Sequence, residues 1–397
     1  MTSIKELSKY SRVDREKSLM IDEVLKEYEE PMLEEKLLLK ELHEDISFSF
    51  KLSKVECDDI YASSSDSLPS KYCPKCGREF PEGENVCFDC LVHLKEISDK
   101  VDVSEIKSAP KFIFNGENDF EDFNRLLNKE NLVKINEFDF SIDDFSDIVK
   151  DIKSQAFRNF DDLVKANEID FDSLDILDKV ILFTKSFVKV EYKSFGGQLG
   201  YFETGTIFID DRQTKSLQIT TLIHELSHFL IQEILIHILC TILDASRNSF
   251  MEVLSSFILS YAPFTQLIDE YSAHNVEGRF TVFGFQDYSS YKQIEQSLNG
   301  EMSFEEIEII KSIGNTFAIN IKEILEALID RDLREEIKEQ FLSDVLDRPN
   351  YNALKMENCQ ILNDEGFIKA IWLILNDGCE VASSNIEKLD ELKEIFT

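Results

Sequence analysis

The sequence predicts a predominantly helical protein of the α+β class, with one small sheet and one compact cysteine module. Three observations support this prediction. Apolar residues recur at helical spacing through most of the 397 residues, as at Ile307, Ile310 and Ile313. Strand-like alternation is confined to residues 186–212, where β-branched and aromatic side chains flank a Gly–Gly turn. Four cysteines stand in two close pairs within residues 73–90.

Composition and charge limit the expected partners and location. The chain has 78 acidic and 43 basic residues, a formal net charge of −35, which repels nucleic acid and anionic lipid. The N-terminus lacks an apolar core of signal-peptide length, and the most apolar stretch, residues 228–243, is interrupted by polar side chains. We therefore expect a cytoplasmic protein with no nucleic-acid or membrane partner, in which clustered cysteines bind metal.

Changes of pattern along the chain predict six segments. Pro31 interrupts a helical spacing near the N-terminus, a Ser-rich stretch without apolar period follows it, and a capping box begins at Ser303. The segments are an acidic helical part (1–61), a linker (62–70), the cysteine module (71–95), a connector (96–116), the main domain (117–300) and a helical C-terminal region (301–397).

The cysteine module is predicted to hold a structural zinc ion. Two residues separate the members of each pair, Cys73 with Cys76 and Cys87 with Cys90. Four thiolates complete a tetrahedral zinc site and leave no open position. The stretch resembles a zinc ribbon: "CPKCG" is the usual knuckle of that family, although Leu91 stands where the second knuckle commonly has glycine. Zinc ribbons serve as docking modules in many unrelated proteins, so this one could bind a protein partner, but the resemblance predicts the metal more strongly than the function.

Residues 222–230, "LIHELSHFL", combine two histidines with a glutamate in an apolar helical run. His224 and His228 are four residues apart, so a helix presents both imidazoles on one face to one metal ion. Glu225 would project beside the open side of that metal, where it can take a proton from water. None of the flanking residues is charged, as expected of a helix buried beneath an active site.

The stretch "TLIHELSHFL" resembles the zincin metallopeptidase signature at every position. The resemblance implies a zincin-like metallopeptidase domain with a catalytic zinc ion held by His224 and His228, and with Glu225 as general base. It also implies that an upstream strand edge binds the substrate backbone. The candidate residues for that edge are Thr206, Ile207 and Phe208.

A catalytic zinc ion needs a third protein ligand. Glu270 and the residues after it, "EYSAH", resemble the second helix of the gluzincins, which implies Glu270 as that ligand. The family usually has Asp or Asn where His274 stands, so two assignments stay open. His274 either supports the site from outside the metal or is itself the ligand beside Glu270. Asp269 is a weaker candidate, with a solvated acid at a helix end as the alternative, and His237 is expected in the core.

These observations lead to the hypothesis of a zinc-dependent peptidase that hydrolyses peptide bonds with a metal-activated water and Glu225 as base. It would carry one catalytic and one structural zinc ion and act on a peptide or protein substrate. The alternative is a non-catalytic zinc-ribbon adaptor whose protease-like domain binds a partner without cutting it. The residues suggested for stabilising an oxyanion are Tyr261, Tyr271, Tyr288 and Tyr291.

Overall fold

The computed structural model forms two compact units, a smaller one of Asp14–Lys100 and a larger one of Met1–Val13 with Val101–Thr397. The residues that the structure describes are 3–13, 71–72, 79–80, 85–87, 92–96, 103, 106–109, 111–113, 139–195, 199–281, 288–298, 302–344, 360–385, 387–388 and 391. The acidic helical part predicted over 14–61 and the linker at 62–70 lie outside them.

The smaller unit contains short antiparallel strand pairs in the region predicted as a zinc ribbon. They are β2 (Lys71–Tyr72) between β3 (Glu79–Phe80) and β6 (Lys95–Glu96), and β4 (Val86–Cys87) beside β5 (Val92–His93). Cys73, Cys76 and Cys90 lie outside the described residues, and Cys87 is described only as the end of β4. The four-thiolate site therefore stays a prediction.

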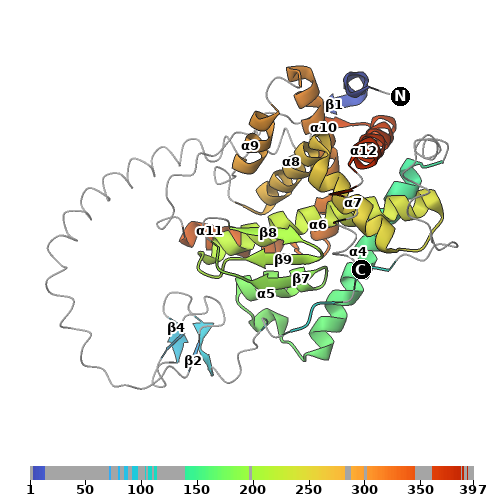
Figure 1. The fold of residues 1–397 in the computed structure, drawn as a ribbon. Helices are drawn as coiled ribbons and strands as arrows, with labels where there is room; N and C mark the ends of the chain where they lie inside the picture. Colours follow the sequence, from blue (N-terminus) through green and yellow to red (C-terminus); the bar gives the residue numbers. More distant parts are fainter. Residues whose placement is uncertain are drawn as a thin grey trace, which may run out of the picture. The chain divides into compact units, whose positions relative to one another are not determined.

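The predicted small sheet is present immediately before the longest helix (Figure 1). It comprises β7 (Lys189–Tyr192), β8 (Gly200–Glu203) and β9 (Thr206–Ile209), in the order β7-β9-β8. β8 and β9 form a hairpin whose two turn residues, Thr204 and Gly205, have φ of 45° and 73°. Positive φ at both positions suits the right-handed twist of a two-residue hairpin. β7 pairs parallel to β9.

The order of the strands corrects one expectation about substrate binding. Thr206, Ile207 and Phe208 belong to β9, which is the central strand and pairs on both sides. A central strand has no unpaired edge to which a peptide could add, so the assignment of these residues to a substrate-binding edge is wrong. β8 and β9 have similar sequence patterns, so the sequence does not show which of them lies at an edge of the sheet. The pairing of β7 with β9 leaves β8 at one edge.

Helix α6 (Lys215–Leu243) forms the centre of the larger unit. It is apolar on all sides, as expected for a helix surrounded by other elements. Within the described part of the chain it is the one helix long and apolar enough to cross a membrane, and 89% of its most apolar window is buried inside the protein. Burial of that kind is typical of a core helix.

The remaining helices surround α6 and the sheet. They are α4 (Ile142–Ala166), η3 (Phe171–Ser173), α5 (Ile176–Lys185), α7 (Ser249–Tyr261), α8 (Pro263–Phe280), α9 (Ser289–Ser297), α10 (Phe304–Leu325), α11 (Arg331–Ser343) and α12 (Asp364–Ser384). α8 packs on both α6 and α10, and α12 packs on α7. The region predicted as a separate C-terminal part is thus continuous with the main domain. The predicted capping box is present, with Ser303 capping α10 and Glu306 reciprocating.

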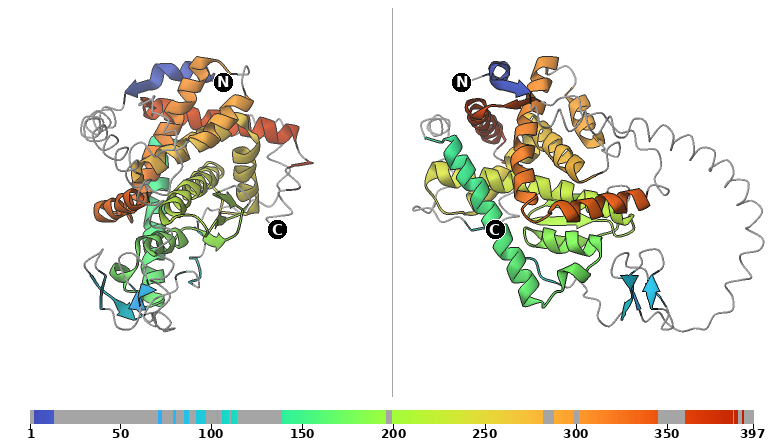
Figure 2. Two further views of the ribbon diagram at one scale, coloured as in Figure 1. Left: turned by 90° about the vertical axis from the view of Figure 1, so that its left-hand side faces the viewer. Right: turned by 180° about the vertical axis from the view of Figure 1, so that it is seen from behind.

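The first residues of the chain also belong to the larger unit. The 3₁₀-helix η1 (Ile4–Tyr10) buries Leu7 completely, and β1 (Ser11–Val13) pairs antiparallel with β10 (Gln360–Leu362). Figure 2 shows this blue segment beside the red helix α12. Residues 3–13 therefore pack with the C-terminal part of the chain, whereas the sequence placed them in one segment with residues 14–61.

Candidate metal centre

Two histidines on α6 face the same point. His224 and His228 lie one helical turn apart, and their Nε2 atoms are 3.1 Å from each other. Their ring centroids are 4.8 Å apart with the planes at 79°. The i, i+4 spacing places both side chains on one face of the helix. The two imidazoles therefore present their Nε2 atoms together.

A carboxylate from α8 reaches the same point. The oxygens of Glu270 lie 3.6 Å from Nε2 of His224 and 3.3 Å from Nε2 of His228. Ligand atoms held about 2.0–2.2 Å from a tetrahedral zinc ion are separated by about 3.3–3.6 Å. The two nitrogens and the carboxylate therefore match the spacing that three ligands of one metal ion require.

Two further carboxylates hold the other nitrogens of these rings. Nδ1 of His224 lies 3.2 Å from Glu277, and Nδ1 of His228 lies 3.0 Å from Asp269. In the neutral form of the ring, which metal binding requires, a carboxylate at Nδ1 favours the proton on that nitrogen and leaves the lone pair on Nε2. Lone pairs of both rings and of Glu270 then meet at one place, an arrangement that attracts a cation.

His274 lies in the same cluster but is bonded differently. Its Nδ1 is 3.3 Å from Glu277, its Nε2 is 2.6 Å from Oγ of Ser290, and the same Nε2 is 3.8 Å from Glu270. His224, Glu270 and His274 each offer one ligand atom, all within 4.8 Å of one another. This group could hold a metal ion, and Glu270 is common to both ligand sets.

Glu225 lies beside the cluster in a buried position, 9% exposed. Burial raises the pKa of Glu225 above its ordinary value, against the opposing effect of His224 and His228. A backbone hydrogen bond from Phe202 of β8 also favours the charged form. A carboxylate whose pKa is raised above its ordinary value is a better proton acceptor, as a general base requires.

These side chains line an open cleft of about 1170 Å³. Its walls come from β8, α6, α7, α9 and α11, and they include Gly200, Tyr201, Thr221, Gln232, Leu259, Tyr261, Ser290 and Phe341. Gly200 allows β8 to approach α6, because a Cβ there would lie 2.5 Å from the carbonyl oxygen of Phe208 and 2.6 Å from Cγ2 of Thr221. The edge strand thus runs along the cleft next to the metal cluster.

The structure shows the surroundings of the other residues that the sequence suggested. Asp269 is buried and forms an ion pair with His228. It is not a solvated acid at a helix end, since α8 begins six residues earlier at Pro263. His237 is fully buried, with Nδ1 2.8 Å from the carbonyl oxygen of Glu233. Of the tyrosines, Tyr261 lines the cleft, whereas Tyr271, Tyr288 and Tyr291 are buried.

Glu277 was not recognised from the sequence, although its spacing contained the signal. It follows Glu270 by seven residues and His274 by three, which places all three on one face of α8. Burial works to raise the pKa of Glu277, but the hydrogen bonds from His224 and His274 outweigh burial and lower it. Glu277 is therefore charged and orients two imidazoles at once.

Comparison with protein-family models, curated proteins and solved structures gives no match. We therefore infer function from the chemistry of these side chains.

In protein stripped of metal by a chelator, both histidines are expected to be protonated near pH 7. Burial would lower the pKa of His224, but hydrogen bonds and charge from Glu270 and Glu277 raise it well above its ordinary value. In the same way Asp269 and Glu270 overcome burial and raise the pKa of His228 to about 9. Metal binding must displace these protons, so about two protons should be released per zinc ion at pH 7. Calorimetry in buffers of different ionisation enthalpy measures this number.

The same shifts set the sign of a pH effect on stability. Because the pKa of His228 is about 9 in the folded chain and 6.5 ordinarily, its contribution is complete below pH 6.5 and disappears as the pH rises through 9. The chelated protein should therefore unfold at a higher urea concentration at pH 6.5 than at pH 9. Zinc-loaded protein serves as the control, and an equal or reversed order of the two midpoints would contradict the expectation.

Proposed function

We propose that this protein is a zinc-dependent peptidase in which His224, His228 and Glu270 hold the catalytic metal. The observation that supports the proposal is that the Nε2 atoms of His224 and His228 and the carboxylate of Glu270 lie 3.1–3.6 Å from one another. Two other carboxylates lie beside the Nδ1 atoms of the same histidines. Two imidazoles and one carboxylate are a donor set that zinc accepts in catalytic sites, where a fourth position is left for water.

Glu270 is favoured over His274 as the third ligand by the contacts of each side chain. Nε2 of His274 lies closer to Ser290 than to Glu270, and its Nδ1 faces Glu277. Both nitrogens of this ring are thus engaged by other groups. Glu270 directs its two oxygens at both α6 histidines. In the proposed site His274 supports the centre from outside the metal through its contacts with Glu277 and Ser290.

The remaining groups have distinct roles in hydrolysis. When bound, zinc supplies Lewis-acid chemistry that polarises a carbonyl and makes water nucleophilic near neutral pH. Glu225 accepts the proton of the attacking water and gives it to the leaving amine. Asp269 and Glu277 keep the α6 imidazoles in the tautomer that exposes Nε2.

A peptide is the proposed substrate because the edge strand β8 runs along the cleft. Its outer side is unpaired within the described residues, so an extended peptide could add there as a further strand. Such binding holds the peptide by its main chain. This role replaces the one expected of β9.

The test is a zinc count combined with cleavage of a peptide library by the full-length chain. The expected result is two zinc ions per chain, of which a mild chelator removes one together with all cleavage, and added zinc restores both. Changing Cys73 and Cys76 to serine should remove the other ion only. A single tightly held ion with no cleavage of any peptide would instead support the non-catalytic adaptor.

A further inference from the structure

Gln232 is a buried polar residue one helical turn beyond His228. It is 7% exposed and lines the cleft. It also lines a second cavity of about 560 Å³. Among the described residues its amide makes no hydrogen bond, and neither amide atom is completely shielded from solvent. The amide therefore faces open space where a ligand could bind it.

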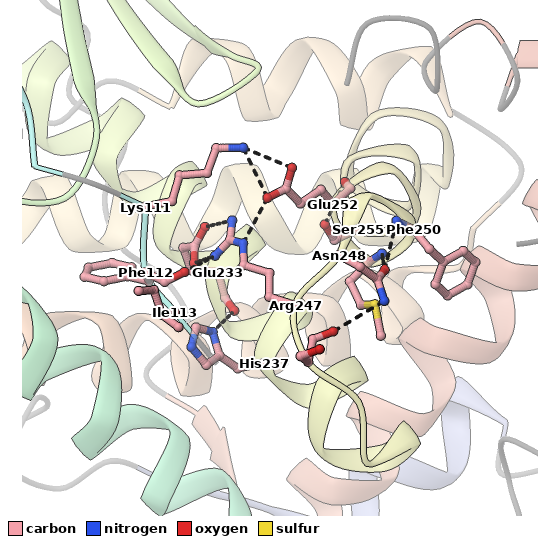
Figure 3. A network of polar contacts seen from close by, with 12 residues as sticks. Lys111, Phe112, Ile113, Glu233, His237, Arg247, Asn248, Phe250, Glu252 and Ser255 are labelled. Atoms are coloured by element: carbon pink, nitrogen blue, oxygen red, sulfur yellow. Dashed lines mark hydrogen bonds and ion pairs between the residues drawn. The ribbon is translucent and has the colours of Figure 1, made fainter. Parts of the chain in front are cut away.

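The second cavity lies between the small sheet, α6, residues 106–109 and Lys111. Its walls are mostly apolar and come from Phe187, Val190, Phe202 and Phe229. Some of the charged groups that line it pair with one another (Figure 3): Arg247 bonds Glu233 and Glu252, and Lys111 bonds Glu252. Lys107 and Lys185 also line it, and Lys185 bonds the carbonyl oxygens of Val103 and Ile106.

The direction of β8 determines which end of a bound peptide would lie near Gln232. β8 runs in the same direction as α6: Gly200 lies against Thr221, and the ring of Phe202 lies 5.9 Å from that of Phe229. Thr204, just past the strand, lines both cavities together with Gln232. A peptide added antiparallel, the commoner pairing, begins at the Gln232 end and leaves at the Thr221 end.

We propose that Gln232 and the second cavity form a subsite for a hydrogen-bonding side chain on the N-terminal side of the cleaved bond. The inference depends on the proposed peptidase function and defines its substrate class. The apolar walls accept the body of the side chain, and the Gln232 amide bonds its polar end.

The test compares wild-type protein with Gln232→Leu, and with Gln296→Leu as matched control, since Gln296 is exposed on α9 and lines neither cavity. Wild-type protein should cleave peptides with Gln or Asn at this position about tenfold faster in kcat/KM than those with Leu. Gln232→Leu should reverse the preference through KM, with kcat little changed, and Gln296→Leu should behave as wild type.

Binding of the same peptides to the Glu225→Gln variant, measured by fluorescence anisotropy, gives a readout that needs no turnover. The added Gln232→Leu change should weaken binding of Gln peptides about tenfold and spare Leu peptides. Cleavage with an unchanged preference, or a preference confined to the C-terminal side of the bond, overturns this inference alone. Absence of both cleavage and peptide binding in wild-type protein overturns the proposed function and the subsite with it.

Discussion

Replacement of Glu225 by glutamine is expected to lower kcat for peptide hydrolysis by about a hundredfold to ten-thousandfold. The amide has nearly the same shape as the carboxylate but cannot accept the proton of the attacking water. Glu225 is not one of the groups whose ligand atoms meet between α6 and α8, so the metal should stay bound. Cleavage assays and a zinc count on the same sample measure both effects.

The matched control for this variant is Glu380→Gln, since Glu380 is an exposed carboxylate on α12 outside the cleft. It removes the same charge and should leave hydrolysis unchanged. Retention of wild-type hydrolysis by Glu225→Gln would show that another group is the base. Loss of zinc from Glu225→Gln would instead show that the side chain holds the metal.

Replacement of Arg247 by methionine is expected to lower the free energy of unfolding by about 3–5 kcal/mol. The guanidinium lies 2.5 and 2.9 Å from the two oxygens of Glu233 and 2.9 Å from Glu252, and it also bonds the carbonyl oxygen of Phe112 (Figure 3). Glu233 is only 3% exposed. Without Arg247, the buried carboxylate of Glu233 would lose the guanidinium that compensates its charge. Urea denaturation followed by circular dichroism measures the loss.

A second variant separates the buried charge from lost packing. Changing Glu233 to methionine together with Arg247 removes both charges and should recover most of the stability, because the penalty comes from leaving one partner alone. The exposed pair Lys150–Asp147, with side chains 70% and 76% exposed, is the control: Lys150→Met should have little effect. If Arg247→Met were as mild as Lys150→Met, the buried network would not stabilise the larger unit.

The sequence was most informative where the chemistry depends on local spacing. His224 and His228 needed only the period of one helix to be placed together, and the capping box at Ser303 needed only three residues. The link between α6 and α8 came from the resemblance of residues 270–274 to a known second helix. Periodicity alone could not show that Glu270 reaches Nε2 of both histidines.

Long-range pairing explains the expectations that the structure corrected. Whether β8 or β9 forms the edge depends on the partner that β7 chooses, and that choice leaves no mark in either strand's own alternation. For Asp269 the sequence left open a weak ligand role and a solvated acid at a helix end, because its ion pair with His228 depends on how α8 packs against α6. Gln232 likewise is an ordinary interruption of an apolar run until the cavities on either side of it are known.

The pairing of β1 with β10 has a consequence for the folding of the chain during its synthesis. Ser11 bonds Gln360, 349 residues further along, so the first strand is made long before its partner. At about 5–20 residues per second, this delay lasts roughly 20 to 70 seconds. During that time β1 has an unpaired edge, the kind of surface that other chains can capture. The larger unit is thus completed late in synthesis.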